Sequence, residues 1–146
     1  MPRPISTGVG TMVGSQTEIL LRHAQLHDDA ATLFRALDER NEMRVASAFR
    51  RFVSNLKGHL DIDLAIGYRL LLRHPSEFVR RLAERVLEDQ VEFPQQFEVL
   101  AARWERASTQ MLLTQAFRDE LETLVSNLLK RIRVEERLLT AISSVA

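Results

Sequence analysis

The sequence predicts an all-α protein, an antiparallel four-helix bundle with up-down-up-down topology. Between residues 15 and 145, glycine occurs only at Gly58 and Gly67 and proline only at Pro75 and Pro94, so few residues interrupt helices. Apolar residues recur there at steps of three and four, a spacing that keeps side chains on one helix face. With 146 residues, of which 45% are hydrophobic and 27% charged, the chain has the size and composition of one globular domain.

The first fifteen residues differ from the rest of the chain. They are rich in Gly, Pro, Ser and Thr and show no periodic apolar pattern, which predicts a flexible arm over residues 1–15 and a bundle over 16–146. The first helix is expected at 15–37. Its core stripe reads Leu20, His23, His27, Ala30, Phe34 and Leu37.

The second helix is expected at 42–73, after a polar break at 38–41. His74 precedes Pro75 and is therefore disfavoured in the α region, which ends the helix. Its stripe reads Phe49, Phe52, Leu56, His59, Asp63, Ile66 and Leu70.

The third and fourth helices are expected at 75–106 and 110–143, with Ser108 and Thr109 between them. Pro94 should kink the third helix or divide it. The third stripe reads Val79, Ala83, Val86, Gln90, Phe93, Phe97, Leu100 and Trp104. The fourth reads Leu121, Leu124, Leu128, Arg131, Glu135, Leu138 and Ile142.

Every stripe is apolar at its ends and polar in its middle. At a rise of about 1.5 Å per residue in antiparallel helices, the four interruptions fall in one layer to within about two turns. Buried polar groups must satisfy one another or hold an ion. His27, His59 and Asp63, with His23 as an additional ligand, could bind iron, manganese or zinc. The alternative is a neutral hydrogen-bonded network that fixes helix register.

Four segments together resemble the hemerythrin-like (HHE) domains. Arg131-Ile-Arg-Val-Glu-Glu-Arg-Leu-Leu is similar to that family's motif of a histidine followed four and five residues later by acids and then by apolar residues. His59 and Asp63 are similar to its histidine and acid four residues apart. His27 resembles the first ligand histidine in its spacing from Ala30, Phe34 and Leu37, and Gln90 has the same spacing from Phe93, Phe97 and Leu100.

The resemblance implies a bundle whose metal ligands would be His27, His59, Asp63, Glu135 and Glu136, with Gln90 and Arg131 in the places of lost ligands. A guanidinium does not deprotonate and cannot bind a metal. We therefore expect Arg131 to pair with Asp63, Glu135 or Glu136, and we expect no di-iron centre. No cofactor is predicted, and the alternative is a single iron or zinc ion.

Charge and composition narrow the function classes. Lys plus Arg and Asp plus Glu balance at 20 each, so neither nucleic acid nor an anionic membrane is an expected partner. Without cysteine there is no disulfide, thiolate site or cysteine nucleophile. No signal peptide or membrane-spanning run is visible, which predicts a cytoplasmic protein. No serine, histidine and acid arrangement or glycine-rich phosphate loop indicates an enzyme.

These observations favour a non-enzymatic bacterial regulatory module that binds a protein partner or forms a homodimer. The first alternative is a hemerythrin-like protein that binds iron or zinc to sense or store oxygen or iron. The second is a transcription regulator, because residues 128–139 and 56–70 are similar to bacterial anti-sigma regulators related to regulator of sigma D. Asn55-Leu-Lys-Gly resembles a phosphotransfer segment, but asparagine stands at the phosphorylatable position.

Overall fold

The computed structural model describes residues 8–61 and 69–144, and it leaves out the side chains at 8–16, 61, 89–91 and 144. Throughout this part of the chain the regular structure is helical, which confirms the all-α prediction. The four long helices of the described residues are α1 (Gly8–Glu39), α2 (Glu42–Asp61), α4 (Glu77–Glu105) and α5 (Gln115–Ser144). Short 3-10 turns lie at Leu71–Arg73 and Met111–Leu113.

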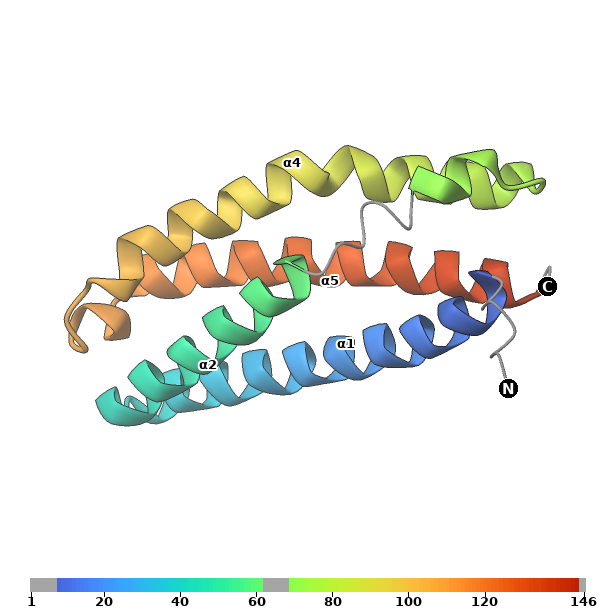
Figure 1. Ribbon diagram of the computed structural model, residues 1–146. Helices are drawn as coiled ribbons and strands as arrows, with labels where there is room; N and C mark the ends of the chain where they lie inside the picture. Colours follow the sequence, from blue (N-terminus) through green and yellow to red (C-terminus); the bar gives the residue numbers. More distant parts are fainter. Residues whose placement is uncertain (1–7, 62–68, 145–146) are drawn as a thin grey trace.

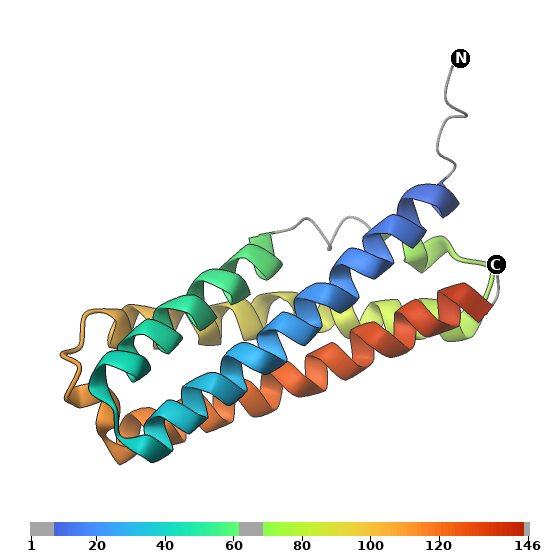
Figure 2. The same ribbon diagram turned by 90° about the horizontal axis from the view of Figure 1, so that it is seen from below.

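The long helices form two antiparallel pairs (Figure 1). α1 packs against α2, α4 packs against α5, and α1 also contacts α5. α2 has 20 residues against 32 in α1, so it runs beside only part of that helix, as both views show (Figures 1 and 2). Among the described residues, no helix is both long and apolar enough to cross a membrane.

The turn between α1 and α2 lies at the predicted polar break. Arg40 has a positive φ of 53°, and its N–H donates to the carbonyl of Leu37. The side-chain oxygen of Asn41 then accepts a hydrogen bond from the backbone N–H of Arg44 at 3.1 Å, which caps the start of α2. One residue in the left-handed region followed by a capping asparagine is therefore enough to reverse the chain.

The largest differences from the predicted helix bounds occur in three places. α1 begins at Gly8 rather than at residue 15, so its first turns run through residues assigned to the flexible arm. α2 is described only as far as Asp61, and the expected continuation to Arg73 falls partly outside the described residues. α5 begins at Gln115, after a 3-10 turn, because the Thr114 hydroxyl accepts from the N–H of Phe117.

α4 begins and bends as its sequence predicts. Ser76 is its N-cap, and the serine hydroxyl accepts a hydrogen bond from the N–H of Val79. Pro94 lies inside the helix without ending it. Proline removes one intrahelical hydrogen bond and crowds the preceding turn, and Figure 1 shows α4 curving along its length.

The described residues form two apolar clusters in the interior. The larger cluster lies toward the α1–α2 turn and contains Phe49, Phe52, Trp104 and Phe117. The smaller one lies between α4 and α5 and includes Val79, Val86 and Leu138. Arg131 and Glu135 of α5 are buried between Leu128, which belongs to the first cluster, and Leu138 of the second. The predicted polar layer between apolar layers is therefore present.

Candidate functional site

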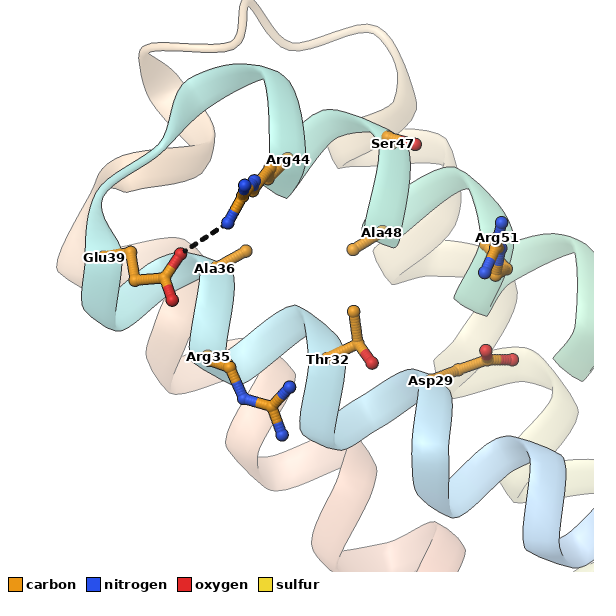
Figure 3. A pocket seen from close by; sticks show the side chains of 9 residues that line it. All are labelled: Asp29, Thr32, Arg35, Ala36, Glu39, Arg44, Ser47, Ala48 and Arg51. Atoms are coloured by element: carbon orange, nitrogen blue, oxygen red, sulfur yellow. Dashed lines mark hydrogen bonds and ion pairs between the residues drawn. The ribbon is translucent and has the colours of Figure 1, made fainter.

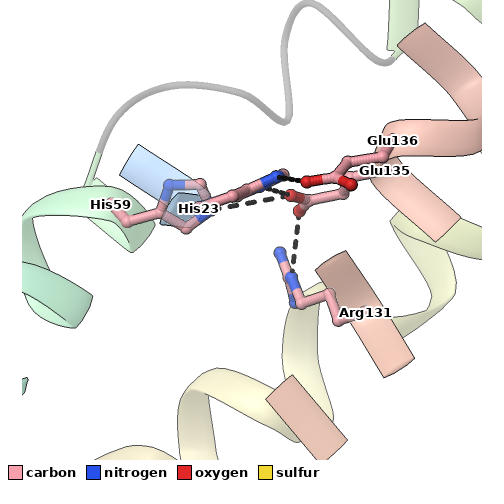
Figure 4. Close-up of polar contacts among 5 residues, drawn as sticks. All are labelled: His23, His59, Arg131, Glu135 and Glu136. Carbon is pink, nitrogen blue, oxygen red and sulfur yellow. Dashed lines mark hydrogen bonds and ion pairs between the residues drawn. The ribbon is translucent and has the colours of Figure 1, made fainter. Parts of the chain in front are cut away.

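Five polar residues from three helices meet in this layer (Figure 4). His23 comes from α1 and His59 from α2, and α5 contributes Arg131, Glu135 and Glu136. His23 and His59 are each 1% exposed, Glu135 is fully buried and Arg131 is 5% exposed. Burying ionisable groups this deeply is costly unless they are paired, so their contacts determine whether the layer stabilises the fold.

Helical spacing brings the α5 groups together. Arg131 and Glu135 are four residues apart, so their side chains share one face of the helix. The Arg131 Nε–H donates to Glu135 Oε1 at 3.2 Å, and the Arg131 guanidinium carbon lies 5.5 Å from the centre of the Phe93 ring. The prediction that Arg131 would pair with an acid is confirmed. Its partner is Glu135.

His23 joins the two carboxylates. Its Nε2 lies 2.7 Å from Glu135 Oε2, and its Nδ1 lies 2.8 Å from Glu136 Oε2. A carboxylate oxygen without a proton can only accept a hydrogen bond, so an imidazole that bonds two carboxylates through both nitrogens is best served by carrying a proton on each. The geometry thus favours a positively charged His23.

His59 lies beside this bridge without a short hydrogen bond to it. Its Nε2 is 3.6 Å from Glu135 Oε2, and its ring meets that of His23 edge-on, with centroids 5.1 Å apart. Its Nδ1 is buried and has no hydrogen-bond partner among the described residues. Within the part of the chain that the structure describes, His59 is therefore the member of the network with the fewest hydrogen bonds.

The contacts shift the two central pKa values in opposite directions. Burial alone would raise the pKa of Glu135, but its contacts with His23 and His59 and the charge of Arg131 outweigh burial and lower that pKa to about 2. Burial would likewise lower the pKa of His23, yet hydrogen bonds and charge from Glu135 and Glu136 raise it above its ordinary value. Each group therefore stabilises the charged form of the other.

The structure corrects the prediction for the first helix. His27 is exposed to solvent, whereas His23, expected only as an additional ligand, is the residue that reaches the interior. The buried face of α1 is set by Ile19, Leu26 and Leu33, and His23 lies on that face while His27 does not. Leu20 and Phe34 have the same seven-residue spacing through His27, so the spacing alone does not distinguish the two histidines.

The other predicted site residues fall into two groups. The structure brings His59, Glu135 and Glu136 together, with the Glu136 side chain 43% exposed at the edge of the network. Asp63 lies outside the described residues, and so does the side chain of Gln90.

This arrangement has the donor set of a metal site as well as that of an ion-pair network. His23, His59 and Glu135 each offer a ligand atom, and these atoms lie within 4.8 Å of one another. Two imidazoles and a carboxylate suit iron or zinc. Glu136 hydrogen bonds the outer nitrogen of His23, as carboxylates do for metal-binding histidines.

Comparison with known proteins gives no relative from which a function could be transferred. No protein-family profile, curated protein or solved structure matches this chain.

Proposed function

We propose that this chain is a non-enzymatic, regulatory or partner-binding module, built as an up-down-up-down hemerythrin-like bundle in which a histidine, glutamate and arginine network replaces the metal centre. The observation that carries the proposal is the buried ion pair between Arg131 and Glu135. A permanent cation occupies the interior beside the carboxylate that a metal would need.

The charges of the network support this proposal. Glu135 and Glu136 contribute two negative charges, and Arg131 and protonated His23 contribute two positive ones. A divalent ion bound through His23 Nε2 would displace a proton and leave one excess positive charge among these groups. Because charge imbalance is expensive in a poorly solvated interior, the metal-free network is the better compensated state.

Exposed apolar side chains support a role in partner binding. Leu70 comes directly before the 3-10 turn at Leu71–Arg73, and Leu72 lies within that turn. Phe78 lies in the first turn of α4. Their exposed fractions are 66%, 38% and 55%. Neighbouring exposed apolar groups often mark a contact surface. We expect Leu70→Ser with Phe78→Ser to weaken the capture of a specific partner while the far-UV circular dichroism spectrum stays unchanged. Equal capture by this double variant would exclude this surface.

The second candidate function is binding of a single iron or zinc ion, favoured by the three ligand atoms within 4.8 Å. His23 Nε2, His59 and Glu135 would hold the ion, and Glu136 would orient His23. A bound ion would supply Lewis acidity or, for iron, redox chemistry. The protein would then sense or store the metal.

Metal analysis separates the two candidates. Protein produced with iron and zinc supplied is analysed by inductively coupled plasma mass spectrometry, and its melting temperature is measured with and without a chelator. The proposal predicts substoichiometric metal and an unchanged melting temperature. A stoichiometric ion that is lost in His23→Ala and His59→Ala but kept in His27→Ala would overturn it and support the second candidate. His27 is the matched control because it is exposed on the same helix.

A further inference from the structure

A polar groove of about 310 Å³ lies between the end of α1 and the start of α2 (Figure 3). The two helices face each other there through the small side chains of Ala36 and Ala48, which leave the hollow open. The volume is at the lower end of the range of about 300–1,000 Å³ found for small-molecule sites. All residues that line the groove belong to α1 and α2, and none belongs to the buried network.

The two acidic residues of the groove already have partners. Glu39 forms an ion pair with Arg44 at 3.2 Å, which Figure 3 marks across the groove. The buried carboxylate of Asp29 accepts hydrogen bonds from the side-chain amides of Gln25 and Asn55. Arg44 compensates the charge of Glu39, whereas the two neutral amides hold the Asp29 carboxylate in place and leave its negative charge.

Four hydrogen-bonding side chains of the groove, unlike its two carboxylates, have no partners among the described residues. Arg35 of α1 and Arg51 of α2 make no hydrogen bond or ion pair with any residue that the structure describes, and the same holds for the hydroxyls of Thr32 and Ser47. In Figure 3, Arg35 and Thr32 extend from α1 and Ser47 and Arg51 from α2, and the two arginines lie on opposite sides of the hollow. Two guanidinium groups and two hydroxyls are therefore available to a ligand.

We propose that this groove binds a small phosphate-bearing anion. The planar guanidinium offers paired N–H donors that match phosphoryl oxygens, and a charged acceptor makes such hydrogen bonds stronger than neutral ones. Arg35 and Arg51 would bind the anion from opposite sides of the groove, and Thr32 and Ser47 would donate to its remaining oxygens. The site is independent of the buried network and of its metal content.

The test titrates magnesium-free inorganic pyrophosphate into ¹⁵N-labelled full-length protein and follows amide chemical shifts. Saturable shifts are expected for residues 32–51. Arg35→Gln and Arg51→Gln should each weaken binding about tenfold, the loss expected for one charged hydrogen bond. Arg50→Gln is the matched control, because it removes the same charge from the neighbouring exposed position outside this groove.

A steric variant separates a shaped site from diffuse attraction. Ser47→Leu keeps every charge, but it adds bulk to the lining of the groove and removes one donor, so it should weaken binding. The proposal would be overturned if the shifts did not saturate up to about 10 mM pyrophosphate, which would place the Kd above the millimolar range. Equal weakening by Arg50→Gln and Arg51→Gln, or unaltered binding by Ser47→Leu, would overturn it as well. Arg51 and Ser47 are exposed, and far-UV circular dichroism verifies that each variant is folded.

Discussion

Replacing Glu135 with glutamine removes one negative charge from the buried network and changes the side-chain shape very little. Glu135 is fully buried, contacts His23 at 2.7 Å and accepts from Arg131 at 3.2 Å. Glutamine can still accept a hydrogen bond, but it cannot balance the charges of His23 and Arg131. Both cations would then be undercompensated in the interior.

The size of the effect follows from the pKa of Glu135. Its ordinary value is 4.5 and its value in the fold is about 2. At about 1.4 kcal/mol per pKa unit, this difference corresponds to about 3 kcal/mol of stability at neutral pH. That figure agrees with the roughly 3–5 kcal/mol lost when one partner of a buried ion pair is removed. We expect Glu135→Gln to lower the free energy of unfolding by about 3 kcal/mol.

Urea unfolding followed by far-UV circular dichroism at pH 7, with a chelator present, measures this loss. Glu136→Gln is the control, because Glu136 is partly exposed and makes one hydrogen bond in the network. Its substitution should cost about 1 kcal/mol. If Glu135→Gln changed the unfolding free energy by no more than about 0.5 kcal/mol, as an ordinary surface substitution does, the reasoning would be refuted.

Three further changes test the pH dependence and the packing. Glu135 contributes stability that is present above its ordinary pKa of 4.5 and is lost as the pH falls toward 2. His23 contributes stability that is present below its ordinary pKa of 6.5 and is lost as the pH rises through its raised pKa. Melting temperatures should therefore be highest between pH 4.5 and 6.5, and His23→Gln should flatten the alkaline decline; an unchanged decline would contradict the role of His23. Gly58→Ala should raise the free energy of unfolding by about 0.5–1 kcal/mol, since Gly58 lies inside α2 and an added Cβ would meet, among the described residues, only Arg22 Nη1 at 3.9 Å. A lower free energy of unfolding would contradict this open packing around Gly58. Phe117→Ala should lower the free energy of unfolding by about 3–5 kcal/mol in the same urea assay, because the buried Phe117 ring packs edge-on against Phe49 and Trp104. A loss below about 1 kcal/mol would contradict that packing.

The helix that the sequence predicts best is α5. Its predicted stripe is buried from Leu121 to Leu138, and Ile142 is half-buried at its end. The spacing holds over six turns, so one face is specified by many residues at once. Arg131 and Glu135 lie on that face, which is why their burial could be predicted before their contacts were known.

α1 shows where periodicity is insufficient. Apolar residues occupy two overlapping faces, and Leu20 and Leu21 are exposed while Ile19 is buried. His23 and His27 are one turn apart, so steps of three and four pass through both. Only the packing against α2 and α5 decides between the two faces, and that packing is not contained in the local sequence.

Side-chain pairs between helices were also beyond prediction. Asn55 belongs to a segment that resembled a phosphotransfer motif, yet it donates to the buried carboxylate of Asp29. Asp29 and Asn55 are 26 residues apart on different helices. Their contact depends on how α1 and α2 cross, and the separate patterns of the two helices do not determine that crossing.

The protonation of His23 is the most direct test of a metal-free, charge-balanced network. Two-dimensional ¹⁵N–¹H spectra of the imidazole nitrogens would be recorded at pH 6, below the ordinary pKa of 6.5, before and after treatment with a chelator. The account predicts that both ring nitrogens of His23 carry protons and that the His23 and His59 signals are unchanged by the chelator. A neutral His23, or ring signals that move when metal is removed, would contradict it.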